Sequence, residues 1–114
     1  MSKLSIRVID SPQASVKVVA LSGEMEESGI ETLRPQLDPL LNEANVKKLV
    51  FDLQDLEFIN SKGIGYLVAV HTHLAKGGRQ LIMAGARESI MDVVNLVGLT
   101  TIIPYFETVE EALT

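Results

Sequence analysis

Ser61 is the residue whose type and position are best suited to chemistry in this chain. It follows Asn60, a second capping residue, and precedes apolar residues at three- and four-residue spacing, so its hydroxyl is expected at a helix N-terminus near the surface. The free N–H groups and positive dipole end of such a helix favour an added anion. Gly63 and Gly65 remove side-chain bulk from the first turn, which would let another protein or a phosphate group approach closely. Packing of the helix against a strand would explain the two glycines equally well.

The other candidate residues do not favour an enzyme or a metal site. His71 and His73 are the two histidines, and a spacing of two on a helix points them to different faces. The chain has no cysteine to complete a ligand set. Ser61 has no histidine placed by the sequence as its base, the serine-centred elbow of hydrolases is absent, and no dinucleotide or phosphate-loop pattern surrounds the glycines. We therefore expect no catalytic residues, cofactor or metal.

Length and charge restrict the remaining classes. The 114 residues are expected to form one domain over 1–114 that needs no disulfides. With no signal-like start and no apolar run of spanning length, the prediction is a cytoplasmic protein without membrane insertion. A net charge of −5 without a basic cluster argues against direct nucleic-acid binding. Glu24, Glu26 and Glu27 could bind a hard cation or a basic partner, although a charge run of this size is usually a solvated loop.

The hydrophobic pattern predicts the elements that must position Ser61. Strands are expected over 4–9, 16–21, 46–51 and 80–84, with the first two antiparallel, Gly23 ending the second, and a loop over 52–57. The acidic segment 24–27 should be a loop before a helix whose apolar series is Ile30, Leu33, Leu37, Leu40 and Leu41. Pro35 and Pro39 fall in this series, so we expect either a bend or a late start with Thr32 as cap.

The second half of the chain is expected to contain three further helices. One covers 61–76, with an inward series at Ile64, Leu67, Val68, His71 and Leu74, and ends at the glycine pair 77–78. The next has an inward series at Ile90, Met91, Val94 and Val97 and stops at Gly98. A short edge strand at 102–103 and a last helix capped by Thr108 complete the prediction.

This order of elements predicts an α/β fold with a mixed sheet of four to five strands, whose later strands are parallel and joined by right-handed crossovers. Function in such sheets is expected where strands end and helices begin. Ser61 lies at such a position, and the loops 23–27 and 85–89 follow strands that could end on the same side.

Residues 52–65, DLQDLEFINSKGIG, resemble the signature of the STAS domain family, in particular the bacterial anti-sigma factor antagonists. The resemblance covers nearly the whole chain and includes the segments 23–26, 77–78, 95–99 and 110–112. It implies a single STAS-like domain with helices packed mainly on one face of the sheet.

The resemblance also implies a regulatory role. In this family the serine corresponding to Ser61 is phosphorylated by a partner anti-sigma factor, a serine protein kinase of the histidine-kinase-like ATPase type, and is dephosphorylated by a PP2C-type phosphatase. The unphosphorylated chain would bind the anti-sigma factor, and the phosphorylated chain would release it. The implied partner-binding residues are Glu24, Glu26, Asn60, Ser61, Lys62, Gly63, Ile64, Gly65 and Tyr66. The family usually has aspartate in place of Asn60 and in place of Glu26.

Two other functions are compatible with the sequence. The chain could be a non-phosphorylated STAS accessory subunit of an ABC-type lipid transport system, and an enzyme or nucleotide-binding role comes third. A homodimer is also compatible with these features, as is an output in transcription or in another partner-switching pathway.

Overall fold

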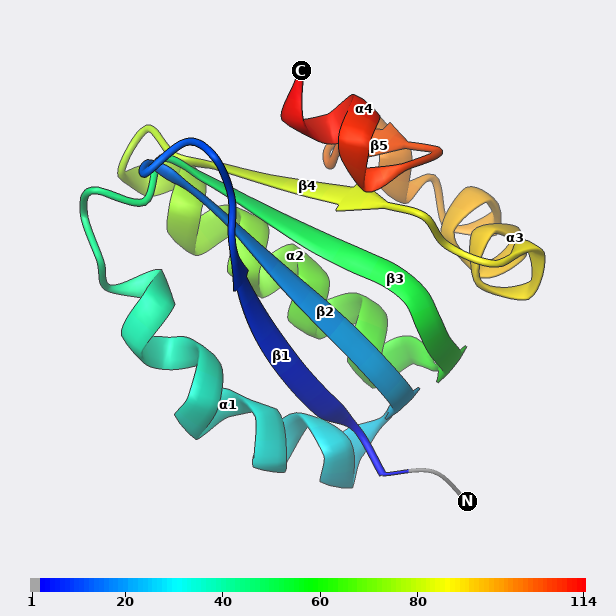
Figure 1. The fold of residues 1–114 in the computed structure, drawn as a ribbon. Coiled ribbons are helices and arrows are strands. Elements are labelled where there is room, and N and C mark those ends of the chain that lie inside the picture. The colour runs from blue at the N-terminus through cyan, green and yellow to red at the C-terminus, as the bar shows by residue number, and fades with distance from the viewer. Residues whose placement is uncertain (1–2) are drawn as a thin grey trace.

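A five-stranded sheet with the order β1-β2-β3-β4-β5 forms the centre of the structure (Figure 1). The computed structural model describes residues 3–114. β1 (Ser5–Asp10) pairs antiparallel with β2 (Val16–Met25). The pairs of β2 with β3 (Lys48–Ile59), of β3 with β4 (Gln80–Ala84) and of β4 with β5 (Tyr105–Phe106) are all parallel. The mixed sheet predicted from the order of elements is therefore confirmed.

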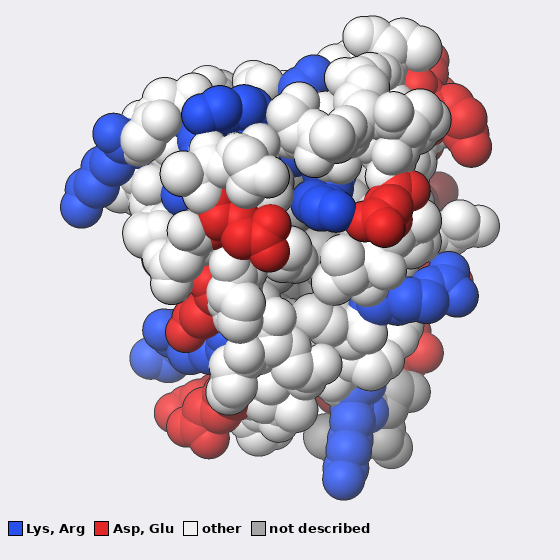
Figure 2. Space-filling view, turned by 60° about the vertical axis from the view of Figure 1, so that its left-hand side comes forward, with Lys and Arg blue, Asp and Glu red and all other residues white. Residues whose placement is uncertain are grey.

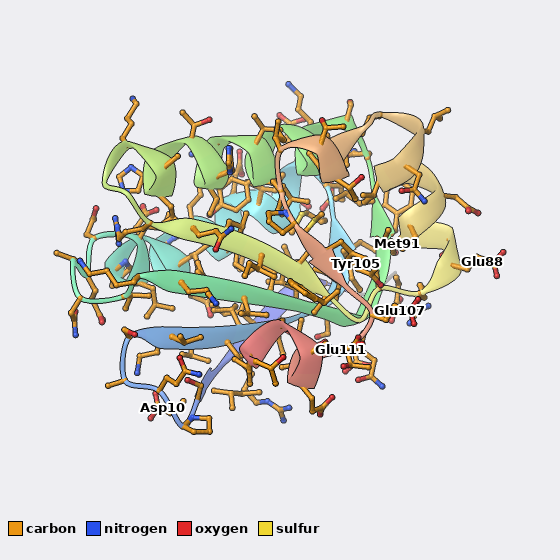
Figure 3. The ribbon with its side chains drawn as sticks, turned by 90° about the horizontal axis from the view of Figure 1, so that it is seen from above. Asp10, Glu88, Met91, Tyr105, Glu107 and Glu111 are labelled. Carbon is orange, nitrogen blue, oxygen red and sulfur yellow. The ribbon has the colours of Figure 1, made fainter. Side chains whose placement is uncertain are left out.

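The helices cover the two faces of the sheet unequally. The main core lies beneath α1 (Glu27–Leu41), α2 (Ser61–Lys76) and α3 (Glu88–Leu96). Strand residues alternate between the faces, so Phe51 enters this core while Val50 points to the opposite face. There a smaller apolar cluster includes Ala112 of α4 (Val109–Leu113), which lies across the sheet from α2 in Figure 3. Helices thus pack mainly on one face, as the family resemblance implied.

Strands β2 and β3 are longer than the sequence predicted. Gly23 does not end β2, and residues 52–57 do not form a loop, because the two strands stay paired as far as Met25 and Ile59. The pairing accommodates two register irregularities, between Ala20 and Ser22 and between Gly23 and Glu24. Gly23 has a φ of +100°, and a Cβ there would overlap the backbone of Lys3, so this glycine lets the segment before β1 pass close to β2.

The predicted acidic loop is also wrong, because Glu24 lies in β2 and Glu27 begins α1. Thr32 does not cap the helix. Glu26 is the N-cap, and its carboxylate accepts hydrogen bonds from the backbone N–H groups of Ser28 (3.3 Å) and Gly29 (2.8 Å).

Both prolines of α1 lie inside the helix rather than delaying its start. A spacing of four places Pro35 and Pro39 on the same exposed side, so the carbonyls that lose their N–H donors lie toward solvent. The apolar series predicted for this helix is buried on the other side: Ile30, Leu33, Leu37, Leu40 and Leu41.

The end of the chain differs from the prediction in two respects. Residues 102–103 follow a 3₁₀ turn, Leu99–Thr101, instead of forming a strand, and the edge strand is β5. Val97 is 52% exposed rather than inward, since α3 ends at Leu96 and the chain turns at Gly98. Thr108 caps α4, as predicted, and the structure adds a capping box with Glu111.

Other predicted elements are confirmed. α2 covers 61–76, and β4 covers 80–84.

Tyr105 connects β5 to the segment before α3, because its hydroxyl accepts a hydrogen bond of 3.1 Å from the N–H of Ala86 (Figure 3). Within residues 3–114, none of the helices combines the length and apolar character needed to cross a membrane.

Candidate functional site

The carboxyl ends of β2 and β3 bring the starts of α1 and α2 to one corner of the fold. Met25 pairs with Ile59 at the end of the two strands, and the backbone N–H of Asn60 donates to the carbonyl of Met25 at 3.3 Å. Both strands then pass directly into a helix. The corner formed by residues 24–27 and 60–66, here called the Ser61 corner, thus joins two of the three loops that the sequence predicted on this side.

The third predicted loop does not reach this corner. β4 ends at Ala84, whose partner in β3 is Asp52, so β3 continues for seven more residues to Ile59. At about 3.3 Å per residue, this extension allows at most about 23 Å of strand, which carries Ile59 well beyond the end of β4. Residues 85–89 therefore lie on the same side of the sheet but near Asp52, where a Cβ on Gly85 would be 3.4 Å from its Oδ1.

Asn60 fixes the start of α2. Its side-chain oxygen accepts a hydrogen bond from the N–H of Gly63 (3.1 Å), and its carbonyl accepts the first helical bond from Ile64 (3.0 Å). Asparagine therefore caps this helix without a charge. Ser61 is the first residue of α2 and is exposed, so its hydroxyl is presented from a backbone held by β2, β3 and the cap.

The two glycines of the first turns have different roles. Gly63 is buried, and a Cβ there would lie 2.5 Å from the carbonyl oxygen of Met25 and 2.6 Å from Cγ1 of Ile59. It allows α2 to start directly against the strands. Gly65 is exposed, and a Cβ there would meet no atom within 4 Å. Of the two explanations that the sequence offered, close packing applies to Gly63, and open access applies to Gly65.

A groove of about 410 Å³ runs between α1 and α2 beside Ser61. Its lining residues are Glu27, Ile30, Glu31 and Arg34 of α1, and Ser61, Lys62, Gly65, Tyr66 and Ala69 of α2. The guanidinium carbon of Arg34 lies 5.2 Å from the centroid of the Tyr66 ring, which is a cation–π distance. The groove thus combines an exposed hydroxyl, two cationic side chains and two carboxylates.

Arg34 is the residue of this groove that the sequence analysis missed. Its position next to Leu33 and four residues after Ile30 places it at the border of the apolar face of α1. That border could be identified from the helical spacing. Its proximity to Tyr66, which is 32 residues later in the chain, depends on how α1 packs against α2.

The residues predicted for partner binding occupy the Ser61 corner but do not all form one surface. Ser61, Lys62 and Gly65 are exposed in the groove, whereas Gly63 is buried and Ile64 packs partly against the core. Glu24 lies in β2, and Glu26 uses its carboxylate as a helix cap. Hydrogen bonds from the Ser28 hydroxyl and from the N–H groups of Gly29 and Ser28 lower the pKa of Glu26.

Tyr66 is 5% exposed although it was expected on the binding surface. Among residues 3–114, its buried hydroxyl has no hydrogen-bond partner. Burial, with a smaller contribution from Asp38, raises the pKa of Tyr66 to about 12, and Arg34 opposes this rise. The Arg34 guanidinium stacks on the Tyr66 ring, and little of the ring itself is exposed to a partner.

Charges of both signs are interspersed on the face shown in Figure 2, so this face has no large patch of one sign. Within the described residues, no three His, Asp or Glu side chains converge as a metal site. A ring nitrogen of His73 lies 3.2 Å from the carbonyl oxygen of Leu41.

The comparisons with known proteins agree with this architecture. A relative from Paenibacillus polymyxa, an anti-sigma F factor antagonist, is 24% identical over 99 residues, which are 87% of this chain and 85% of the relative. The crystal structure of an anti-sigma factor antagonist from Mycobacterium paratuberculosis has a TM-score of 0.86 at 25% identity, covering 97% of this chain and 92% of that chain. The Bacillus cell fate determinant SpoIIAA in its phosphorylated form shares the fold, with a TM-score of 0.71 at 19% identity and 96% coverage of both chains.

The family assignment follows from the extent of the sequence match. The STAS domain model matches residues 6–112, which include β2 to β5, α1 to α3, all but the last residue of α4, and the Ser61 corner. The resemblance seen in residues 52–65 is thus confirmed over nearly the whole length, and this chain belongs to the STAS domain family.

Proposed function

We propose that this chain is an anti-sigma factor antagonist whose binding to an anti-sigma factor is switched by phosphorylation of Ser61. The observation that carries the proposal is the exposed Ser61 hydroxyl at the first position of α2, on a backbone fixed by Asn60 and Met25. The Paenibacillus polymyxa relative and the Mycobacterium paratuberculosis structure are both anti-sigma factor antagonists, which favours this role over that of a transporter accessory subunit.

The phosphorylation step requires an enzyme other than this chain. The oxygen of Ser61 would form a bond to the γ-phosphorus of ATP held by the anti-sigma factor kinase, ADP would leave, and a base of the kinase would take the hydroxyl proton. Hydrolysis by a PP2C-type phosphatase would restore the hydroxyl and release inorganic phosphate. This chain would be the substrate in both steps.

A phosphate on Ser61 is expected to act on the partner and to leave the fold intact. It adds about −1.5 to −2 charges at pH 7, and the positive end of α2 stabilises negative charge at that position. Asn60 is neutral, so it adds no repulsion beside the phosphate. Bulk and charge at the exposed corner would instead oppose a partner surface shaped for the free hydroxyl, because the phosphate would lose its water there.

A binding titration against the anti-sigma factor kinase tests this proposal. Ser61→Ala should bind as tightly as the natural chain, and Ser61→Asp or the phosphorylated chain should bind at least about tenfold more weakly, which is about 1.4 kcal/mol. Ser89→Asp is a matched control, because Ser89 is an exposed serine in the first turn of α3. Mass spectrometry after incubation with the kinase and ATP should place the phosphate on Ser61 and not on Ser89.

Two results would reject the proposal. One is equal affinity of the Ser61→Ala and Ser61→Asp chains for the kinase. The other is a thermal melt in which Ser61→Asp loses most of its stability while its intrinsic affinity is unchanged, since the switch would then act through unfolding.

A further inference from the structure

Arg34 presents a guanidinium that has no acidic partner in the described part of the chain. The one ion pair within residues 3–114 joins Lys17 of β2 to Asp10 of β1, and neither residue lines this groove. Arg34 is exposed, and its guanidinium is positioned over the Tyr66 ring rather than by a carboxylate. Stacking leaves the edge donors of a guanidinium free for an anion, and two of them can bind one phosphate.

The groove provides space between this guanidinium and Ser61. Both residues line it, together with Gly65, which lies four residues after Ser61 on the same side of α2. A Cβ on Gly65 would meet no atom within 4 Å, so the missing side chain leaves this part of the groove open. Side chains on a helix incline toward its N-terminus, which directs the Tyr66 ring and the arginine above it back toward the turn of Ser61.

The other charges of the groove make Arg34 the decisive cation. Lys62 of α2 is the second cationic side chain, and Glu27 and Glu31 of α1 are the two carboxylates. Without Arg34, a phosphate would face two carboxylates and one ammonium group. With Arg34, the charges of the lining residues balance before the phosphate is added.

We infer that Arg34 binds the phosphate of Ser61 within the same chain, so that phosphorylation both adds a dianion and neutralises a cation in the groove between α1 and α2. This inference rests on the proposed phosphorylation of Ser61. Arg34 is then the residue that contacts the added phosphate directly. A partner that pairs an acidic side chain with Arg34 in the unphosphorylated chain loses that contact when the phosphate occupies it.

Phosphorus-31 NMR can test the contact without any partner. Phosphoserine is incorporated at position 61 during translation, and the second ionisation of its phosphate is titrated. A cation nearby favours the dianion, so the natural chain should show a second pKa at least about 0.5 unit lower than the Arg34→Gln chain. Arg34→Lys keeps the charge but loses the paired donors, and it should give an intermediate value.

Arg7→Gln is the matched control for net charge. Arg7 is exposed in β1 and pairs with Ala20, on the sheet face opposite the groove, so this variant should titrate like the natural chain. A far-UV circular dichroism melt of each variant verifies that it is folded at the titration temperature. The Arg34 side chain is exposed, so its replacement is expected to preserve the fold.

The inference is overturned if Arg34→Gln and the natural chain have the same second pKa, because the phosphate would then face solvent. That result would leave the proposed function unaffected, since the titration involves no partner and the affinities of the Ser61 variants are measured separately. A loss of partner discrimination between Ser61→Ala and Ser61→Asp would reject the proposed function while the NMR result stood.

Discussion

The contrast between Gly63 and Gly65 offers a direct test of how α2 is attached to the sheet. Both glycines lie within the first five residues of the same helix, and both are replaced by alanine. Alanine in a helix is more favourable than glycine by about 1 kcal/mol, so local propensity alone predicts that both variants gain stability.

The packing at the two positions predicts opposite signs. The methyl group of Gly63→Ala would lie 2.5 Å from the carbonyl oxygen of Met25, a backbone atom that also accepts a hydrogen bond from Asn60. Overpacking costs about 1–3 kcal/mol, and a contact this short to a backbone atom belongs to the upper part of that range, about 2–3 kcal/mol. After the propensity gain of about 1 kcal/mol, the variant should lose about 1–2 kcal/mol. Gly65→Ala meets no neighbouring atom and should gain about 0.5–1 kcal/mol.

Urea denaturation followed by far-UV circular dichroism measures this difference. The two variants should be separated by about 2 kcal/mol with unchanged m-values, or by about 8 °C or more in a thermal melt. Equal stability of the two variants would refute the reasoning, because it would mean that α2 does not start in contact with β2. Gly65→Ala is also informative for function, since it fills the groove beside Ser61 in a chain that remains folded.

Four further predictions concern the residues that support the corner. Asn60→Ala should lower the free energy of unfolding by about 1 kcal/mol, because the Gly63 N–H loses its acceptor, while Asn60→Asp should retain the cap; urea denaturation of both compares them. Tyr66→Phe should raise stability by up to about 1 kcal/mol because it removes a buried hydroxyl without a partner among the described residues, and a loss of that size would contradict this account. The pKa of Tyr66 is about 12, against an ordinary value of 10.0, so the folded chain keeps the phenolic proton to a higher pH than the unfolded chain does. The free energy of unfolding should therefore fall as pH rises from 10 toward 12, with tyrosinate absorbance as the measurement. The lowered pKa of Glu26 implies a stabilisation that is present above the ordinary value of 4.5 and is lost as pH falls through the folded value. Glu26→Gln should therefore be less stable than the natural chain near neutral pH and equally stable in acid. The same dependence of unfolding free energy on pH in both chains would contradict this.

The elements of the fold were predictable where one strong local signal determined them. The capping residue Asn60 indicated the start of α2, the glycine pair 77–78 indicated its end, and Thr108 indicated the start of α4. The predictions were wrong where pairing in the sheet outweighed local polarity. Polar residues between Asp52 and Glu57 resemble a loop, yet β3 continues through them because β2 supplies its hydrogen-bond partners.

The sequence by itself determined the family and selected Ser61 as the candidate site of modification. The ordered motif of residues 52–65 and a serine beside a helix cap are local features, and they do not depend on contacts between distant segments. The sequence could not distinguish the roles of Gly63 and Gly65, because both glycines have the same conformational freedom. They differ in what an added Cβ would meet, which is the backbone of Met25 at Gly63 and no atom within 4 Å at Gly65.

Only the tertiary structure decided the surroundings of Ser61. The packing of α1 beside α2 places Arg34 over Tyr66, opens the groove next to the serine, and buries a tyrosine that the sequence assigned to the surface. These relations join residues about thirty positions apart in the chain. They arise from the parallel crossovers that bring the starts of both helices to the same edge of the sheet, and periodicity within one helix contains no information about its neighbour.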